Sequence, residues 1–226
     1  MRSRGRLRII IAIATAVAGL VALAYPPSSN LWYDRRTDLT RGTFTSRLAG
    51  DARDPLYQHL EAENERLFET GQSDLVDAFS FEVPGIDLTQ YGLADDRIGY
   101  IDLPTIDMTL PIFLGATKAN LRLGAVHLAQ TSYPIGGPNT TTVIAAHRGG
   151  ALKMFRNIHL MRIGDEITIT NPFGRLTYRT VEIRIIKPTD IDAIKIQPGR
   201  DVVALITCNP LGHSYERYVV FCERVA

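Results

Sequence analysis

The chain has 226 residues, of which 22% are charged, and its formal net charge is +1 at pH 7. This length provides for one domain of ordinary size plus a tail or an anchor, and such a domain buries a core without disulfide staples. Because the charge is near neutral and no basic stripe alternates with aromatic residues, the sequence does not support a nucleic-acid-binding surface.

The N-terminus combines basic and apolar residues. Four arginines in MRSRGRLR precede an apolar run from Ile9 to Ala24, and no acidic residue occurs before Asp34. This asymmetry predicts that the N-terminus lies inside the cell and the rest of the chain outside. We therefore expect residues 1–25 to form a single-pass anchor in the cell membrane. A cleaved signal peptide is the alternative, since Ala22-Leu23-Ala24 fits a small-x-small cleavage pattern. Both interpretations make the folded part extracytoplasmic.

Residues 26–94 form a polar, charged region in which helices are predicted. The clearest helix runs from Asp54 to Phe68, because Asp54 suits the N-cap, Pro55 the first helical position and Gly71 the stop. We expect this region to act as a helical spacer that holds the following domain away from the membrane.

From Ile98 onward the sequence changes to short β-rich runs separated by Gly, Pro and Asn. These runs are GYIDL, MTLPIFL, TTTVIAAH, EITIT, RLTYRTVEIRIIKP, DVVALITC and RYVVFCER, and Asn171-Pro172-Phe173-Gly174 is a turn between two of them. Many short strands with few helical patterns predict a mainly β domain, either a sandwich or a closed barrel, over residues 95–226.

Only two cysteines occur, Cys208 and Cys222, which excludes a disulfide framework and a zinc site built from paired Cys-x-x-Cys motifs. The runs VVALITC and RYVVFCER predict an antiparallel hairpin in which Cys208 faces Arg217 or Tyr218, and Cys222 faces Val203. The two sulfurs would then lie about 15 Å apart along the strands, beyond disulfide reach. We expect two separate thiols.

Cys208 is the first candidate for chemistry, because it lies at the end of an apolar strand and is followed by Asn-Pro and a loop. That position predicts a side chain that emerges at a sheet edge. A single cysteine is more often a small buried hydrophobe than a nucleophile, and Cys222, in the middle of its strand, fits that description.

His147 is the first candidate partner for this thiol, because it ends the apolar run VIAAH and precedes Arg148-Gly149-Gly150, a loop that must turn sharply. An imidazole there can protonate a departing amine, and as a cation it can hold a neighbouring thiol as thiolate. Alone, His147 would be read as a structural histidine. His213, in the loop after the cysteine, is the second candidate. The remaining histidines, at positions 59, 127 and 159, lie in a helix or beside apolar segments.

Arg217 opens the return strand, so the hairpin brings it to the same end of the sheet as Cys208. A guanidinium there can donate two hydrogen bonds to a carbonyl oxygen that becomes anionic during thiolate attack, or bind the substrate backbone. An arginine solvated at the start of a strand is the alternative.

These residues lie in motifs that together resemble the sortases, specifically the pilin-polymerising class C group. The motifs are, in chain order, GYIDLPTI, TLPIFLG, GAVHLAQTSYPIGGPNT, VIAAHRG, FRNI, GDEITI, ALITCNPLG and ERYVVFCER. The resemblance covers most of the chain from Asp77 to Arg224. It implies a closed eight-stranded β-barrel with Cys208 as nucleophile, His147 as acid/base partner and Arg217 as the residue that stabilises substrate or oxyanion.

Class C sortases also resemble one another in a lid, an Asp-Pro-aromatic segment that covers the active site until substrate arrives. The resemblance assigns this lid to Asp77-Ala78-Phe79, with Ala in place of Pro. A second match at Asp54-Pro55 is better explained as a helix start. Two further departures are Ala204, where the family's Thr-Leu-x-Thr-Cys pattern begins with Thr, and the lack of the C-terminal membrane segment of many pilin sortases.

The resemblance implies a membrane-anchored cysteine transpeptidase of a Gram-positive cell. It would cleave an LPXTG-like sorting signal between Thr and Gly, form a thioacyl intermediate on Cys208 and pass the acyl group to a pilin lysine, using no metal or organic cofactor. LPXTG-bearing pilins or surface proteins are the implied partners. Three alternatives stay open: a housekeeping sortase that joins proteins to the cell wall, a hydrolase in which water resolves the thioester, and a tethered β-barrel interaction module without chemistry.

Overall fold

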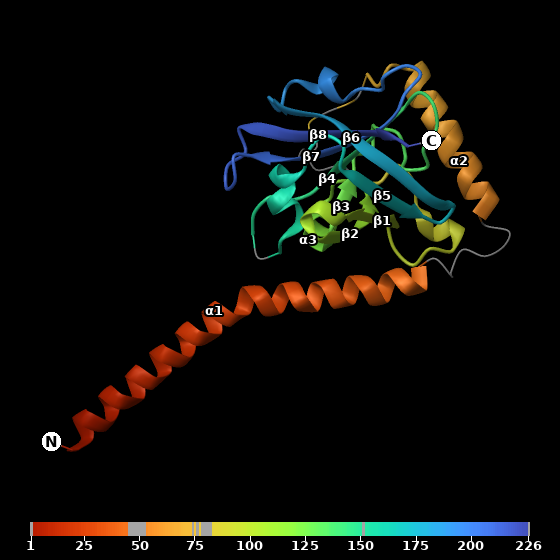
Figure 1. Cartoon of the computed structure of the whole chain (residues 1–226). Helices are drawn as coiled ribbons and strands as arrows, with labels where there is room; N and C mark the ends of the chain where they lie inside the picture. Colours follow the sequence, from red (N-terminus) through yellow and green to blue (C-terminus); the bar gives the residue numbers. More distant parts are fainter. Residues whose placement is uncertain are drawn as a thin grey trace.

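The structure, a computed structural model, describes residues 2–44, 53–73, 75, 77, 83–150 and 152–225, without the side chains of residues 2–7, 23, 26–27 and 42–43. Eight strands in these ranges close into one barrel in the order β1-β2-β3-β4-β7-β8-β6-β5 (Figure 1). The strands are β1 (Arg97–Leu103), β2 (Met108–Leu114), β3 (Ala125–His127), β4 (Thr140–Ala145), β5 (Glu166–Asn171), β6 (Gly174–Ile186), β7 (Asp201–Asn209) and β8 (Glu216–Arg224).

The closed eight-stranded barrel confirms the expected architecture and decides between barrel and sandwich. Within it, β2–β3 and β4–β7 are parallel pairs, and the other pairs are antiparallel. The turn predicted at residues 171–174 connects β5 to β6, where the Asn171 side chain accepts hydrogen bonds from the amides of Phe173 and Gly174 at 2.8 and 2.9 Å. Strand β3 was not predicted, because three residues are too few to show an alternating pattern.

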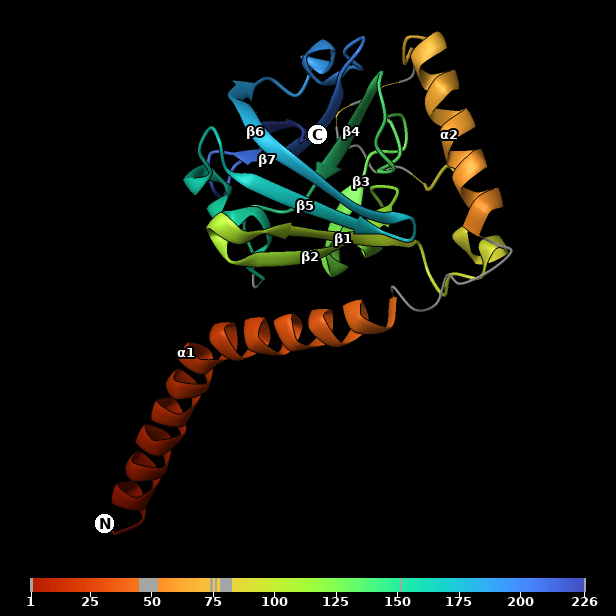
Figure 2. The same ribbon diagram turned by 45° about the vertical axis from the view of Figure 1, so that its right-hand side comes forward.

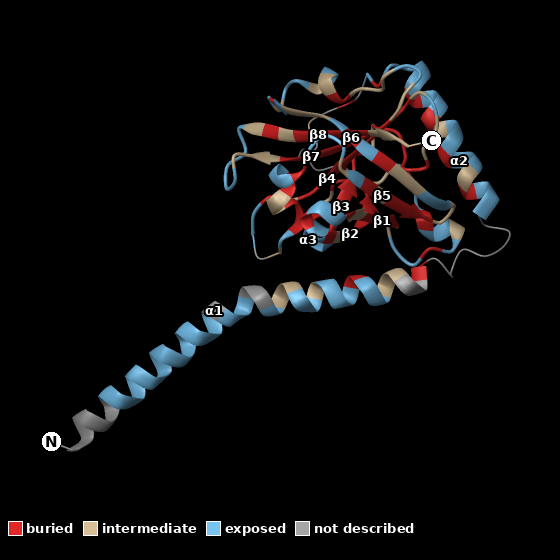
Figure 3. Ribbon diagram, viewed as in Figure 1, coloured by how far each residue is buried: buried red, intermediate tan, exposed pale blue. Residues whose placement is uncertain are grey.

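Alternating side chains of the strands divide the apolar residues into two clusters. One cluster draws on all eight strands and fills the barrel. The second takes the other face of β4, β7 and β8, where it packs with Leu75, from the segment before the barrel, and with Ile194. Residue Ile194 belongs to η4 (Ile191–Ile194), and α3 (Lys118–Leu123) contributes Leu121 to the same cluster. Figure 3 shows that most of the buried residues lie in the barrel, whereas β6 is largely intermediate or exposed.

Helix α1 (Arg2–Phe44) precedes the barrel and bends between two arms (Figures 1 and 2). Pro26 and Pro27 lie within it, and a proline pair withholds two amide donors from the helical ladder, which favours a bend. The first arm is exposed to solvent (Figure 3). Within the described part of the chain, no helix reaches the length and apolarity that crossing a membrane requires.

The second arm of α1 packs on the barrel through polar contacts. Arg41 donates two hydrogen bonds to the carboxylate of Asp102 on β1, at 2.7 and 2.6 Å. Tyr100 on β1 donates to Thr40 at 2.9 Å, and the ring of Phe44 meets the Tyr100 ring edge-on with centroids 5.5 Å apart. This arm is therefore part of the folded domain.

Helix α2 (Arg53–Glu69) begins one residue before the predicted N-cap, so Asp54 lies in the first helical turn, where a carboxylate faces the positive end of the helix dipole. Its buried residues Leu56, Leu60, Asn64 and Leu67 recur at helical spacing. The Asn64 side chain accepts from the amide of Tyr133 at 2.7 Å, so this helix lies against the barrel. Gly71, at φ +64, ends it as predicted.

Candidate active site

The β7–β8 hairpin places a thiol opposite a guanidinium. Cys208 pairs with Arg217 and Cys222 pairs with Val203, so both parts of the predicted register are confirmed. The Arg217 Nη1 atom lies 3.9 Å from the Cys208 Sγ atom. Arg217 is nearly buried, with 6% of its side chain exposed, whereas Cys208 is partly accessible. The cation lowers the pKa of the neighbouring thiol, although burial has the larger, opposite effect, and it fits the stabilisation of an anionic oxygen.

Cys208 and Arg217 share the face of the sheet that carries the second apolar cluster. On β7, Ala204 and Ile206 belong to that cluster, and Cys208 is the next residue of the same alternation. On β8, Val219 belongs to it, two residues after Arg217. Side chains at alternate positions of a strand point to the same face. The pair therefore lies outside the barrel interior, under the segment that contains Leu75.

His147 lies two residues beyond β4, which ends at Ala145, so it does not close the strand as the sequence predicted. The parallel register pairs Ala145 with Ile206, and two further steps bring His147 level with Cys208. Side-chain contacts before and after His147 hold this segment against the end of β7. Thr207 Oγ1 donates to the carbonyl of Ala146 at 2.7 Å, and Arg148 Nη1 lies 3.5 Å from the carbonyl oxygen of Cys208. The backbone at residue 147 therefore runs beside the end of β7 that carries Cys208.

Asp77, in the segment before the barrel, binds the guanidinium of Arg217 through its carboxylate. Arg217 Nε donates to Asp77 Oδ1 at 2.8 Å, and Nη2 donates to Oδ2 at 2.5 Å. Leu75, two residues earlier, is 3% exposed and packs in the second apolar cluster. The other residue assigned to the lid, Phe79, lies outside the described residues, as does Ala78 between them.

Both groups proposed for proton transfer are shifted toward their neutral forms. Burial raises the pKa of the Cys208 thiol, Arg217 lowers it, Asp77 raises it and Arg148 lowers it, and the net change is a rise. Burial also lowers the pKa of His147. With Asp77 in place, the site therefore favours a thiol and a neutral imidazole, because a partly dry pocket penalises charge. The thiolate and imidazolium pair considered from the sequence is not the favoured pair in this state.

A polar chain beneath the rim was missed by reasoning from the sequence. Arg148 Nη1 donates to Asn209 Oδ1 at 2.5 Å, and Asn209 Nδ2 donates to Glu216 Oε2 at 2.8 Å. The guanidinium of Arg148 also lies 5.1 Å from the centre of the Tyr218 ring. This chain ties the segment after His147 to both strands of the hairpin. The motif VIAAHRG contained the signal, but Arg148 was read there only as part of a turn.

The remaining cysteine and the buried histidine have structural environments. Cys222 is 0% exposed and contacts Thr180 Oγ1 through its sulfur at 3.5 Å, and burial raises its thiol pKa to about 12. His127 is 0% exposed, stacks on Tyr133 and has its Nε2 atom 3.1 Å from the carbonyl oxygens of Thr131 and Ser132. Neither group is placed for attack on a substrate.

The other histidines lie on the surface. His213 is exposed in the β7–β8 loop, where its ring lies 5.4 Å from that of Tyr215, and His159 is exposed in the last turn of η3 (Met154–Leu160). His59 faces Tyr91, with 3.3 Å between its Nδ1 atom and the phenol oxygen. Among the described residues, no group of three or more His, Cys, Asp or Glu side chains is arranged to hold a metal ion.

Fold and site together define a closed β-barrel with a cysteine and an arginine at its rim. The family model for the sortase domain matches residues 101–225, more than half of the chain. The chain belongs to the sortase family, whose members are cysteine transpeptidases.

Relatives of known sequence carry the same family name. The chain is 28% identical over 130 residues to Sortase D of Bacillus subtilis (strain 168), covering 56% of this chain and 63% of that protein. It is 27% identical over 130 residues to Sortase A of Streptococcus agalactiae, covering 56% of this chain and 52% of that protein. The chain thus matches less than two thirds of the length of these two relatives.

Solved structures of pilus sortases are similar over a larger part of the chain. Sortase C1 of Pilus Island 1 from Group B Streptococcus has a TM-score of 0.76 and 25% identity, covering 85% of this chain and 92% of that one. Sortase C2 of the same pilus island has a TM-score of 0.71 and 28% identity, covering 79% of this chain and all of that one. The structural neighbours are therefore class C pilus sortases, as the sequence motifs predicted.

Proposed function

We propose that this chain is a class C sortase that joins pilin subunits, with Cys208 as nucleophile, His147 as general acid and base, and Arg217 as the cation that stabilises the oxyanion. The observation that carries the proposal is the 3.9 Å contact between Arg217 Nη1 and the Cys208 sulfur at the end of the hairpin. The similarity to pilus sortases supports the choice of a pilin as substrate.

In the first half of the reaction, the Cys208 thiol passes its proton to His147 and the sulfur attacks the Thr-Gly carbonyl of an LPXTG-like signal. The carbonyl oxygen becomes anionic, and Arg217 donates to it. The C–N bond then breaks, the imidazolium gives its proton to the leaving glycine amine, and a thioester remains on Cys208.

In the second half, a lysine amine of the next pilin attacks the thioester. His147 takes a proton from this amine, the C–S bond breaks, and the sulfur leaves with a proton regained through the imidazole. The product is an isopeptide bond. No atom outside the chain and its two substrates is needed for this balance.

Asp77 acts in this proposal as a lid residue, together with the segment that continues to Phe79. Its carboxylate occupies two of the guanidinium nitrogens that would face the substrate oxygen, and its charge raises the pKa of Cys208. Substrate entry would therefore displace Asp77 from Arg217. The pair of Arg217 with Asp77 is charge-assisted and lies at a partly accessible site. The hydrogen bonds that Arg217 loses when Asp77 leaves are replaced by bonds to acceptor oxygens of the substrate.

We also propose that the first arm of α1 holds the protein at the cell membrane with the barrel outside, although the described part of this arm falls short of the length and apolarity of a spanning helix. Support comes from the four arginines before Ile9 and from the exposed apolar side chains that follow, among them Ile9, Ile13 and Leu20 at 61, 58 and 67% exposure. Membrane fractionation and protease protection in a Gram-positive host test this topology. Recovery of intact protein in the soluble fraction would contradict it.

The test of transpeptidation uses the full chain, an LPXTG peptide and a pilin that carries a lysine acceptor. We expect an acyl adduct on Cys208 by mass spectrometry and then a peptide–pilin conjugate. Cys208→Ala should give neither, and Cys222→Ala should give both, because the second thiol is buried. Full activity of Cys208→Ala would refute the proposal.

The same assay separates the alternatives. The similarity to relatives named Sortase A is the reason to test the housekeeping alternative. A housekeeping sortase would prefer a cell-wall amine over a pilin lysine as acceptor. A hydrolase would release free acid whether or not an amine is present. A barrel module without chemistry would form no adduct, and its Cys208 would react with alkylating agents independently of His147.

A further inference from the structure

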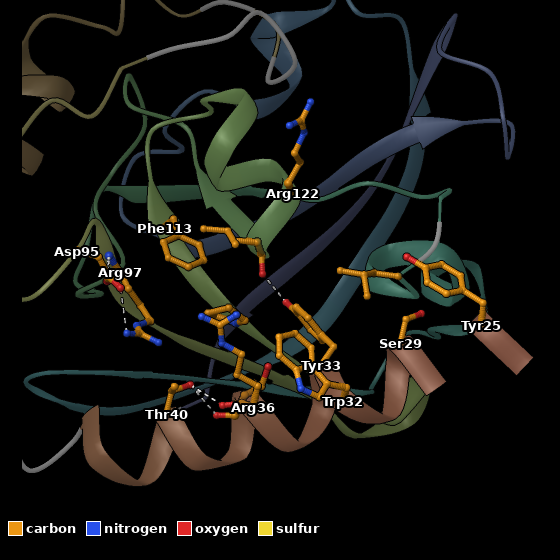
Figure 4. A pocket seen from close by; sticks show the side chains of 14 residues that line it. Tyr25, Ser29, Trp32, Tyr33, Arg36, Thr40, Asp95, Arg97, Phe113 and Arg122 are labelled. Carbon is orange, nitrogen blue, oxygen red and sulfur yellow. Dashed lines mark hydrogen bonds and ion pairs between the residues drawn. The ribbon is translucent and has the colours of Figure 1, made fainter. Parts of the chain in front are cut away.

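A groove of about 450 Å³ lies between the second arm of α1 and the barrel (Figure 4). Its barrel wall comes from β1, β2 and α3 rather than from the β7–β8 rim that carries the Cys208 sulfur. Apolar and aromatic side chains form most of its walls, with arginines among them. The lining residues include Trp32, Tyr33, Arg36, Phe113, Arg122 and Leu123.

The helix wall of the groove presents an aromatic ring and a cation together. Trp32 and Arg36 are one helical turn apart, and the guanidinium carbon of Arg36 lies 5.3 Å from the centre of the Trp32 ring. Figure 4 shows both side chains with Tyr33 on the part of α1 that faces the barrel. The phenol of Tyr33 donates to the carbonyl of Leu123 at 2.7 Å, which fixes the helix to the opposite wall.

The charges in the groove leave a positive excess. Arg97 is paired with Asp95 at 3.1 Å, whereas no ion pair to a carboxylate is formed by Arg36 or Arg122 within the described residues. The opposite wall supplies apolar surface from Phe113 and Leu123. Figure 4 shows the Arg122 side chain pointing away from α1, so Arg36 is the cation that faces the apolar walls. Such a site suits a ligand that joins a hydrocarbon chain to an anionic head, because the walls bury the chain and the guanidinium binds the anion.

The position of the groove along α1 identifies the source of such a ligand. The lining begins at Tyr25, directly after the apolar run that ends at Ala24. Tryptophan, tyrosine and arginine are the residues that concentrate where a protein meets lipid headgroups. Trp32 is 64% exposed, so the groove is open to a lipid at that level.

We propose that this groove binds one anionic phospholipid, with the phosphate on Arg36 and the start of an acyl chain along Phe113 and Leu123. The bound lipid would hold the second arm of α1 and the barrel in one orientation above the membrane. The site does not depend on the proposed transpeptidation, and its binding is measurable without a bilayer.

Trp32 is the only tryptophan of the chain, so its fluorescence reports on the groove directly. The full-length protein in a neutral detergent is titrated with short-chain phosphatidylglycerol, with phosphatidylcholine of the same chain length and with inorganic phosphate. We expect a saturable blue shift with phosphatidylglycerol and binding of the other two that is weaker by about tenfold or more, the factor for one lost charge-assisted hydrogen bond. Equal responses to the two lipids would overturn the proposal.

Two arginine variants locate the site. Arg36→Gln should weaken binding of phosphatidylglycerol by about tenfold, whereas Arg122→Gln should have a smaller effect, because its side chain points away from α1. Arg35→Gln is the matched control, because Arg35 is exposed on the same helix and does not line the groove. Native mass spectrometry should show one bound lipid on the wild type and on Arg35→Gln. A loss with Arg35→Gln as large as with Arg36→Gln, or no loss with Arg36→Gln, would contradict a defined site.

Discussion

The guanidinium of Arg217 is held on one side by the carboxylate of Asp77, at 2.8 and 2.5 Å, while its Nη1 atom stays 3.9 Å from the Cys208 sulfur on the other. One cation therefore serves both a residue of the proposed lid and the proposed nucleophile. The carboxylate opposes the effect of the cation on the thiol, because Asp77 raises the pKa of Cys208 and Arg217 lowers it.

Asp77→Ala should activate the thiol. Without the carboxylate, the pKa of Cys208 falls and Arg217 is released toward substrate, so alkylation by iodoacetamide at pH 7 should accelerate by up to about tenfold per pKa unit. Asp192→Ala is the control, since Asp192 forms an exposed ion pair with Lys195. Slower alkylation of Asp77→Ala than of the wild type would contradict this assignment.

Arg217→Gln should have the opposite effect on Cys208. Removal of the cation raises the pKa of the thiol, so the curve of alkylation rate against pH should move to higher pH. Arg217→Lys keeps the charge without the planar fork and should leave that curve closer to wild type while cleavage of the LPXTG peptide still falls. A curve that is unchanged in Arg217→Gln would show that the guanidinium does not influence the sulfur.

Arg148 should position the rim through Asn209. Arg148→Gln breaks the contact to Asn209 Oδ1 and should reduce stability by about 1–3 kcal/mol, the cost of a lost buried hydrogen bond to a charged group. It should also lower kcat with little change in KM, and move the alkylation curve to higher pH, because Arg148 lowers the pKa of Cys208. Asn209→Ala should lower kcat without moving the curve. Equal kcat values for Arg148→Gln and wild type would rule out a positioning role.

His127 should make the fold sensitive to acid. Burial lowers its pKa from 6.5 to about 4, so the folded state resists protonation that the unfolded state accepts. Its contribution is complete above about pH 6.5 and falls as the pH drops toward 4, with a loss on the order of 2 kcal/mol at pH 5. Urea unfolding at pH 7 and pH 5 should show this loss in the wild type and a smaller one in His127→Gln. The same pH dependence in both proteins would exclude His127 as its source.

Strand pairing at the hairpin was predictable because its signals are local. Two β-rich runs joined by the loop 209–216 limit the register closely, so the sequence placed Cys208 opposite Arg217 or Tyr218 and Cys222 opposite Val203, and the structure selects Arg217. The helix from residue 54 was predictable for a similar reason, since its cap, its proline and its terminal glycine lie within one short segment. Strand β3 escaped because three residues carry no period.

By itself, the sequence determined the family and the β-rich domain, and it singled out Cys208, His147 and Arg217 as candidates, because motif order, alternation and strand ends are properties of neighbouring residues. Only the tertiary structure decided what surrounds those residues. The pair of Arg217 with Asp77 joins positions 140 residues apart, and the Arg148–Asn209 contact joins positions 61 apart. Contacts over such separations exist only once the barrel has closed. The same is true of the burial that shifts the pKa values of Cys208 and His147 and so favours their neutral forms. The physical reason is that no local pattern specifies which distant side chains will share a dry pocket.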